Sequence, residues 1–151
     1  MNSVSYSLLL EQLKALTQDV PYPVANLANA SALLWQELPQ INWAGFYQLQ
    51  ENLLILGPFQ GKPACIRIPM GKGVCGTAAA SGKTVRVDNV HDFPGHIACD
   101  GASNSEIVVP IFANGQLWGV LDIDSPVFSR FTPEDQQGLE AFAAWMGQIL
   151  A

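Results

Sequence analysis

The chain has 151 residues, which is enough for one domain with a substantial buried core. Apolar residues make up 49% of the chain and charged residues only 13%, a mixture that excludes a disordered protein. The formal net charge is -6, and the seven basic residues are spread along the chain. This charge balance argues against a nucleic-acid surface and against a polybasic membrane patch.

No stretch of the sequence is apolar enough to cross a membrane. The two longest uncharged stretches, 20–36 and 107–121, both contain proline and asparagine. The N-terminus has no basic region and reaches an acid at Glu11, unlike a secretory signal. We therefore expect a cytoplasmic protein, in which Cys65, Cys75 and Cys99 do not form a permanent disulfide framework.

The first half of the chain predicts two helices followed by short strands. Leucines at positions 9, 13 and 16 have helical spacing, and a second helix is expected from about 21 to 38, before Pro39. Four short elements follow, namely a β-hairpin, a strand, a short helix closed by Gly82 and a further strand: 42–50 with 53–57, 65–69, 74–80 and 84–88.

The second half contains the clearest local signals. Residues 89–103 form a long irregular stretch, and a connection of this length is usually functional. Strands 106–113 and 116–124 flank Asn114-Gly115, which is typical of a type I′ hairpin. The last helix begins after Thr132, a good N-cap. The order of the elements indicates an α+β fold with a central antiparallel β-sheet and N- and C-terminal helices packed on it.

Two aromatic residues share one face of the first predicted strand. Trp43 and Tyr47 are separated by Gly45 on that face, and the glycine leaves a gap that could admit a small apolar group. The alternative interpretation is a core aromatic pair beside a closely packed backbone, which is the more frequent role of aromatic residues.

Two acids share a face at the end of the last predicted strand. Asp122 and Asp124 lie about 7 Å apart if the strand is regular. Two neighbouring carboxylates repel each other, so one pKa should rise, and an acid that stays protonated near neutral pH can donate a proton. The alternative is a solvated strand end.

Glu106 is the third candidate acid, on the partner strand. A regular two-residue hairpin places Ile107 opposite Asp122 and turns Glu106 to the other face. One extra residue at Pro110 would shift the register and turn Glu106 toward Asp122. We expect such an irregularity if the three acids form one site.

The cysteines have several possible roles. Cys99 follows His96 in the long loop, where a histidinium would favour a thiolate and Asp100 would oppose it. Cys75 lies early in the short helix, where the helix dipole would also favour a thiolate. The simplest alternative is that all three are small buried hydrophobic residues. A zinc site of three cysteines and one histidine is a further alternative, but the spacing is not that of a zinc ribbon.

Taken together, these segments resemble the free methionine-(R)-sulfoxide reductases, which are single-domain GAF proteins. The matching stretches are NWAGFY, GPFQGKPACIRIPMGKGVCGTAA, HIACDGASNSEIVVP, GVLDIDSP and FTPEDQQGLEAF. The resemblance covers nearly the whole chain. It implies one GAF-type catalytic domain over residues 1–151, with helices packed on a central antiparallel sheet.

The resemblance also implies the reaction, the reduction of free methionine-(R)-sulfoxide to methionine without a metal or cofactor. In the family, the cysteine that matches Cys99 is the nucleophile, and the one that matches Cys65 forms a disulfide with it. The one that matches Cys75 is a second resolving thiol. Thioredoxin is the expected reductant, and family members are often homodimers.

The remaining site residues implied by the resemblance surround the substrate. The positions that match Trp43 and Tyr47 line a pocket for the substrate methyl group, and those that match Glu106, Asp122 and Asp124 bind and activate the substrate. A different reading of the same fold is a GAF sensor module that binds a small ligand without catalysis.

Overall fold

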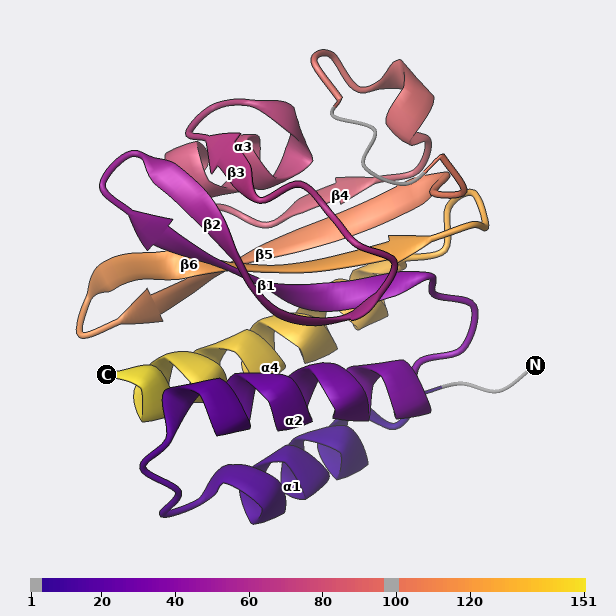
Figure 1. Cartoon of the computed structure of the whole chain (residues 1–151). Coiled ribbons are helices and arrows are strands. Elements are labelled where there is room, and N and C mark those ends of the chain that lie inside the picture. The colour runs from indigo at the N-terminus through magenta and orange to yellow at the C-terminus, as the bar shows by residue number, and fades with distance from the viewer. Residues whose placement is uncertain (1–3, 97–100) are drawn as a thin grey trace.

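In the computed structural model, which describes residues 4–96 and 101–151, a β-sheet separates a helical layer from a smaller layer (Figure 1). Helices α2 (Pro23–Glu37) and α4 (Pro133–Leu150) cover one face of the sheet, and α1 (Tyr6–Thr17) packs on both of them. The opposite face carries α3 (Gly73–Ser81), and the single-turn helix η1 (Val90–Asp92) lies on the same side of the sheet.

The sheet has the strand order β3-β2-β1-β6-β5-β4, and every neighbouring pair is antiparallel. The strands are β1 (Trp43–Gln50), β2 (Leu53–Gly61), β3 (Arg67–Pro69), β4 (Val85–Val87), β5 (Ser105–Ala113) and β6 (Gln116–Ser125). The predicted α+β architecture is therefore confirmed, with α2 and α4 on the sheet and α1 packed on these two helices.

The two faces of the sheet have separate hydrophobic cores because side chains alternate along each strand. In β1, Ala44 and Phe46 join the core under α1, α2 and α4. Trp43 and Tyr47 point to the other face, where they pack with Val74 and other residues of α3. The second, smaller core leaves room for a pocket beside α3.

The local signals in the second half of the chain are confirmed. Asn114 and Gly115 have φ angles of 54° and 76°, as a type I′ turn requires at both central positions. Thr132 and Asp135 form a reciprocal capping box at the start of α4. Within residues 4–96 and 101–151, none of the helices combines the length and apolar character that a membrane-spanning helix needs.

Two strands and one helix differ from the predicted pattern. β2 continues past Gly57 to Gly61, and its last residues still pair with β1 after a shift of the register between Gly45 and Tyr47. The third strand begins at Arg67, so Cys65 lies in the loop before it. In α1 the buried leucines are Leu9 and Leu13, whereas Leu16 is 44% exposed.

Candidate active site

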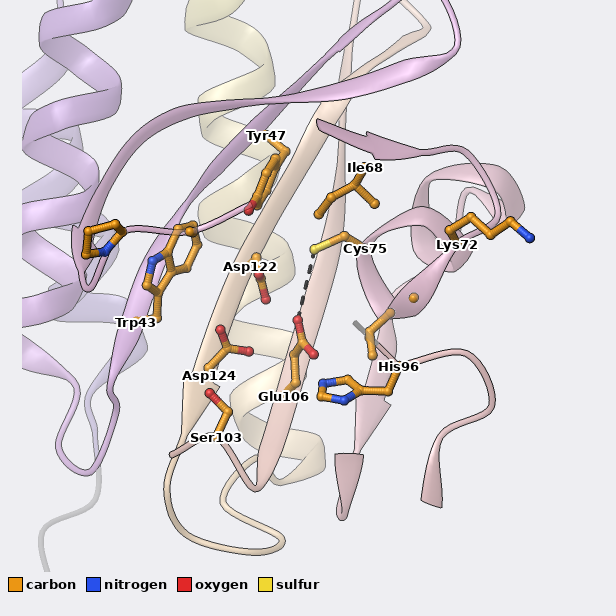
Figure 2. Close-up of a pocket in the computed structure, with 14 residues that line it drawn as sticks. Trp43, Tyr47, Ile68, Lys72, Cys75, His96, Ser103, Glu106, Asp122 and Asp124 are labelled. Carbon is orange, nitrogen blue, oxygen red and sulfur yellow. Dashed lines mark hydrogen bonds between the residues drawn. The ribbon is translucent and has the colours of Figure 1, made fainter. Parts of the chain in front are cut away.

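A pocket opens on the α3 side of the sheet, as Figure 2 shows. Its floor is formed by β1, β5 and β6, and its walls come from the start of α3 and the adjoining loops. Protein atoms leave about 550 Å³ of space there, counting the open mouth. The lining residues are Trp43, Tyr47, Pro63, Ala64, Ile68, Lys72, Gly73, Val74, Cys75, His96, Ser103, Glu106, Asp122 and Asp124.

The strand register brings the three candidate acids together on this floor. Glu106 of β5 lies directly opposite Asp124 of β6, and on the other side of β6 Asp124 lies opposite Trp43. Asp122 lies one pleat further along β6, opposite Gly45. All three carboxyl groups line the pocket, and Glu106 and Asp122 are buried.

The irregularity that turns Glu106 into the pocket exists, but it is not at Pro110. Phe112 pairs with Leu117 and Ile111 pairs with Gly119, so Trp118 of β6 is the extra residue. Pro110 pairs in register with Val120, and β4, which begins opposite Val108, does not extend to it. An extra residue on either strand moves the register by one, so the bulge in β6 has the predicted effect on Glu106.

Burial controls the charge of the acids. It raises the pKa of Glu106 well above its ordinary value, and the neighbouring Asp122 and Asp124 raise it further. Burial also raises the pKa of Asp122, but hydrogen bonds from Glu106, Cys75 and Asp124 act in the opposite direction and favour its charged form. Of these two acids, Glu106 is therefore the one whose protonated form is favoured more strongly, whereas its neighbours support the charged form of Asp122.

Cys75 is a free thiol at the N-terminal end of α3, and it is buried against the acids. Its Sγ lies 4.0 Å from Oε2 of Glu106 (Figure 2). Burial raises the pKa of this thiol well above its ordinary value, and Asp122 and Glu106 raise it further. The expectation that the helix dipole makes Cys75 a thiolate is therefore wrong, because loss of solvent and negative neighbours outweigh the dipole.

The aromatic pair holds the loop that carries Cys65. The Trp43 and Tyr47 rings stack with centroids 5.9 Å apart. The Trp43 Nε1–H group donates to the carbonyl oxygen of Lys62 at 3.1 Å, and the Tyr47 hydroxyl donates to the carbonyl oxygen of Cys65 at 2.9 Å. Cys65 is half-buried and disulfide-bonded. The remaining candidate, Cys99, lies outside the described residues.

The gap expected at Gly45 is filled by the neighbouring strand. A Cβ atom on Gly45 would lie 2.2 Å from the Cβ and 2.8 Å from the Cα of Phe59, which belongs to β2. Phe59 also stacks on Trp43, with ring centroids 5.1 Å apart. Gly45 is thus required for the close approach of β2, and the aromatic pair shapes the pocket wall without a slot between its rings.

The sequence analysis missed some of the pocket lining. Ser103 is buried and accepts a hydrogen bond of 3.0 Å from Nδ2 of Asn42, but nothing in its residue type distinguished it from a loop serine. Ile68 could have been found from the alternation in β3, where it is the buried residue. His96 lines the pocket, and burial followed by the nearby His91 lowers its pKa. His96 is therefore neutral at neutral pH, contrary to the histidinium weighed for Cys99.

One group in the described part of the chain has the composition of a metal site. The candidate ligand atoms of Cys75, Glu106 and Asp122 lie within 4.8 Å of one another. The zinc alternative weighed from the sequence needs a different set, three cysteine thiolates and a histidine. Cys65 cannot act as a thiolate ligand while it is disulfide-bonded.

The fold and site together define the class of the protein. A six-stranded antiparallel sheet with α2 and α4 on one face and a pocket beside α3 on the other is the arrangement of a GAF domain, and residues 9–150 match the GAF domain family model. Because proteins with this fold have many different functions, the fold alone does not say to which group of GAF proteins the chain belongs, and the residues of the pocket must decide.

Relatives of the chain narrow the assignment. It is 60% identical over 128 residues to the free methionine-R-sulfoxide reductase of Escherichia coli (strain K12), covering 85% of this chain and 78% of that protein. The reduced form of fRMsr of Staphylococcus aureus matches with 53% identity and a TM-score of 0.96, covering 99% of this chain and 97% of that one. The free methionine-R-sulfoxide reductase of Neisseria meningitidis, solved with its substrate, matches with 40% identity and a TM-score of 0.92 over 99% and 95% of the two chains. The chain belongs to the GAF domain family, in the group of the free methionine-R-sulfoxide reductases.

Proposed function

We propose that the protein reduces free methionine-(R)-sulfoxide to methionine. The proposal depends above all on the convergence of Glu106, Asp122 and Asp124 in a pocket lined by the stacked rings of Trp43 and Tyr47. A free amino acid offers an ammonium group to the carboxylates and an apolar end to the rings. The 60% identity with the Escherichia coli enzyme supports this substrate.

Asp122 is the best candidate to bind the substrate ammonium group. Its Oδ1 atom is buried and accepts no hydrogen bond from the described residues. A buried carboxylate oxygen without a donor is costly, and an ammonium group would supply both the donor and the compensating charge. A methionine sulfoxide inside a polypeptide has an amide at this position, so the site would select the free amino acid.

In the first step the Cys99 thiolate attacks the electrophilic sulfur of the sulfoxide, and the sulfoxide oxygen takes a proton. Glu106 fits the role of proton donor, because burial and its acidic neighbours raise its pKa and so favour the protonated form. The hydroxyl group then passes to the cysteine, methionine leaves, and Cys99 becomes a sulfenic acid. The substrate sulfur gains two electrons and the cysteine sulfur loses two.

In the second step the Cys65 thiol attacks the sulfenic acid, a disulfide forms and water leaves. Cys65 is disulfide-bonded and Cys75 is a free thiol, which supports Cys65 as the resolving cysteine and Cys75 as a reserve. A dithiol reductant then reopens the disulfide by exchange. The family resemblance supplies three further parts of the proposal, namely thioredoxin as this reductant, a homodimer and a cytoplasmic location.

The decisive experiment is an assay with the separated (R) and (S) epimers of free methionine sulfoxide and dithiothreitol as reductant. We expect methionine from the (R) epimer and none from the (S) epimer. Cys99→Ser should abolish the reaction, whereas Cys65→Ser should form about one methionine per chain with thioredoxin unless Cys75 replaces it.

Four outcomes would contradict the proposal. Wild-type protein that turns over neither epimer would show that it is not this reductase, and full multiple turnover by Cys99→Ser would remove Cys99 from the first step. Stabilisation by a cyclic nucleotide or another small ligand, without turnover, would favour a GAF sensor module. Stoichiometric zinc in the purified protein would favour the metal-site alternative.

A further inference from the structure

Most of the basic residues of the chain lie in one segment that contains no acids, although the net charge of the whole chain is negative. Residues 52–87 contain five of the seven basic residues and none of the thirteen acids. The rest of the chain therefore has two basic residues and all the acids. The segment that carries Cys65 and Cys75 is thus cationic within an acidic protein, so the basic residues are less evenly spread than the sequence first indicates.

Three of these cations belong to the segment that borders the pocket: Lys72 lines it, Lys62 directly precedes the lining residue Pro63, and Arg67 directly precedes the lining residue Ile68. Lys62 and Arg67 flank Cys65 in the chain, and Lys72 follows β3; all three side chains are exposed. Figure 2 shows the Lys72 amine pointing away from the carboxyl groups of the pocket. The salt bridge within the described part of the chain joins Arg130 and Asp135, on another part of the surface, so these three cations are available to a partner.

An exposed aliphatic side chain lies among these cations. Ile66 follows the half-buried Cys65 and precedes the exposed Arg67, and its own side chain is 60% exposed. A single exposed hydrophobic residue is ordinary on a protein surface. Here, however, the exposed apolar residue has charged neighbours and lies beside the Cys65 disulfide. An apolar centre with a polar border is the composition of a protein interface. We call Lys62, Ile66, Arg67 and Lys72 the cationic rim.

We propose that the cationic rim is the docking surface for the protein that reduces the Cys65 disulfide, a dithiol protein with acidic side chains around its reactive cysteine. This inference rests on the proposed redox cycle, but only on its last step. The partner thiolate attacks Sγ of Cys65, and a mixed disulfide forms while the other cysteine of the disulfide leaves as a thiolate. The second partner thiol then attacks the mixed disulfide, so that this chain gains two electrons and the partner becomes oxidised.

The positions of the two described cysteines favour Cys65 as the point of attack. Cys75 is buried within α3 and lines the pocket, whereas Cys65 is half-buried in the loop before β3. Because the whole chain carries a net charge of -6, it would repel an acidic partner at long range. A local cationic rim would reverse this effect where exchange takes place, and salt would weaken it.

The test measures reduction of the oxidised protein by reduced thioredoxin under stopped flow, without any sulfoxide. We compare wild type with Arg67→Glu and with Lys83→Glu, which changes the net charge equally but lies beyond the C-terminal end of α3. Arg67→Glu should lower the second-order rate constant roughly tenfold at low ionic strength, and Lys83→Glu should leave it nearly unchanged. High salt should remove most of this difference. Ile66→Ser should lower the rate constant at every salt concentration.

Dithiothreitol, which is small and uncharged, is the control reductant and should reduce all variants at the wild-type rate. Equal losses in Arg67→Glu and Lys83→Glu, or a rate that does not respond to salt, would overturn the docking surface. So would an equal loss with dithiothreitol, because the substitution would then act on the disulfide itself. Failure to reduce methionine sulfoxide would overturn the proposed function and leave this measurement valid.

Discussion

Tyr47 holds the backbone of Cys65 through a hydrogen bond of 2.9 Å from its hydroxyl group to the Cys65 carbonyl oxygen. Trp43 makes the corresponding bond to Lys62, three residues earlier in the same loop. The two aromatic residues therefore have two tasks. Their rings form the pocket wall, and their polar atoms fix the loop that presents Cys65 to the site.

Replacement of Tyr47 by phenylalanine separates these two tasks. Tyr47→Phe keeps the ring and removes the bond to Cys65, so we expect a small change in KM and a slower formation of the disulfide. The free energy of unfolding should fall by about 1 kcal/mol, the usual value of one hydrogen bond. Counting free thiols at intervals after a single turnover measures the rate of disulfide formation.

The matched control for this substitution is Tyr22→Phe, which removes the hydroxyl group of an exposed tyrosine. It should leave both steps unchanged. If Tyr47→Phe closes its disulfide as fast as wild type, the bond to Cys65 does not position the resolving cysteine.

Glu106→Gln tests the proposed proton donor. Glutamine has nearly the same shape but cannot protonate the sulfoxide oxygen, so we expect kcat to fall roughly 100-fold or more. The buried pocket should keep its fold, because the substitution removes a buried acid without changing its volume. Steady-state assays and near-UV circular dichroism measure the two effects. A near-wild-type kcat in Glu106→Gln would show that Glu106 is not the proton donor, and the role would then fall to Asp122 or Asp124.

The same substitution predicts a change in the pH dependence of stability. Burial raises the pKa of Glu106 well above 4.5, so the folded state keeps a proton that the unfolded state releases. The free energy of unfolding of the wild type should therefore fall as pH rises above about 4.5, by up to ~1.4 kcal/mol per pH unit for this group, until the folded pKa is passed. Urea unfolding between pH 4 and 8 measures this slope.

Glu106→Gln should flatten the curve, although the raised pKa of Asp122 contributes a slope of the same sign that persists. The control is Glu11→Gln on the exposed side of α1, which should preserve the wild-type curve. Identical curves for wild type and Glu106→Gln would show that Glu106 is ionised at neutral pH.

Features governed by neighbouring residues could be predicted from the sequence. The alternation in β1 placed Trp43 and Tyr47 on one face, and Asn114-Gly115 fixed the turn between β5 and β6. The prediction that one extra residue turns Glu106 to the pocket was also correct. The predicted position of the extra residue, Pro110, was wrong. A proline shows only that a strand tolerates an irregularity, whereas the position of the bulge at Trp118 is set by how β6 pairs with β5.

Features that depend on distant segments could not be predicted. The interpretation of Cys75 used the dipole of its own helix, but its pKa depends on burial beside Asp122 and Glu106, which come from other elements. In the same way, Gly45 predicted either a gap or a closely packed backbone, and only the pairing of β1 with β2 decides for the backbone of β2. The roles of the site residues came from the family resemblance and stay predictions until the variants are measured.

The chemistry of Cys75 leads to a prediction about its reactivity. Since burial and the neighbouring acids raise the pKa of the thiol, little thiolate is present at neutral pH. We expect Cys75 in the folded protein to resist iodoacetamide at pH 7 and to react rapidly once urea unfolds the chain. Mass spectrometry of tryptic peptides measures the modification. Fast, stoichiometric alkylation of the folded protein would mean that the pocket opens to expose this thiol.

Gly45→Ala tests whether the close approach of β2 shapes the pocket. The added methyl group would lie 2.8 Å from the Cα of Phe59, so backbone must move and a rotamer change cannot relieve the clash. We expect a loss of about 1–3 kcal/mol in the free energy of unfolding, typical of overpacking, together with a raised KM because Trp43 stacks on Phe59. Gly101→Ala is the control, since a Cβ there meets no atom of the described residues within 4 Å. Wild-type stability in Gly45→Ala would show that β2 can withdraw from β1, and the aromatic wall would then not depend on the glycine.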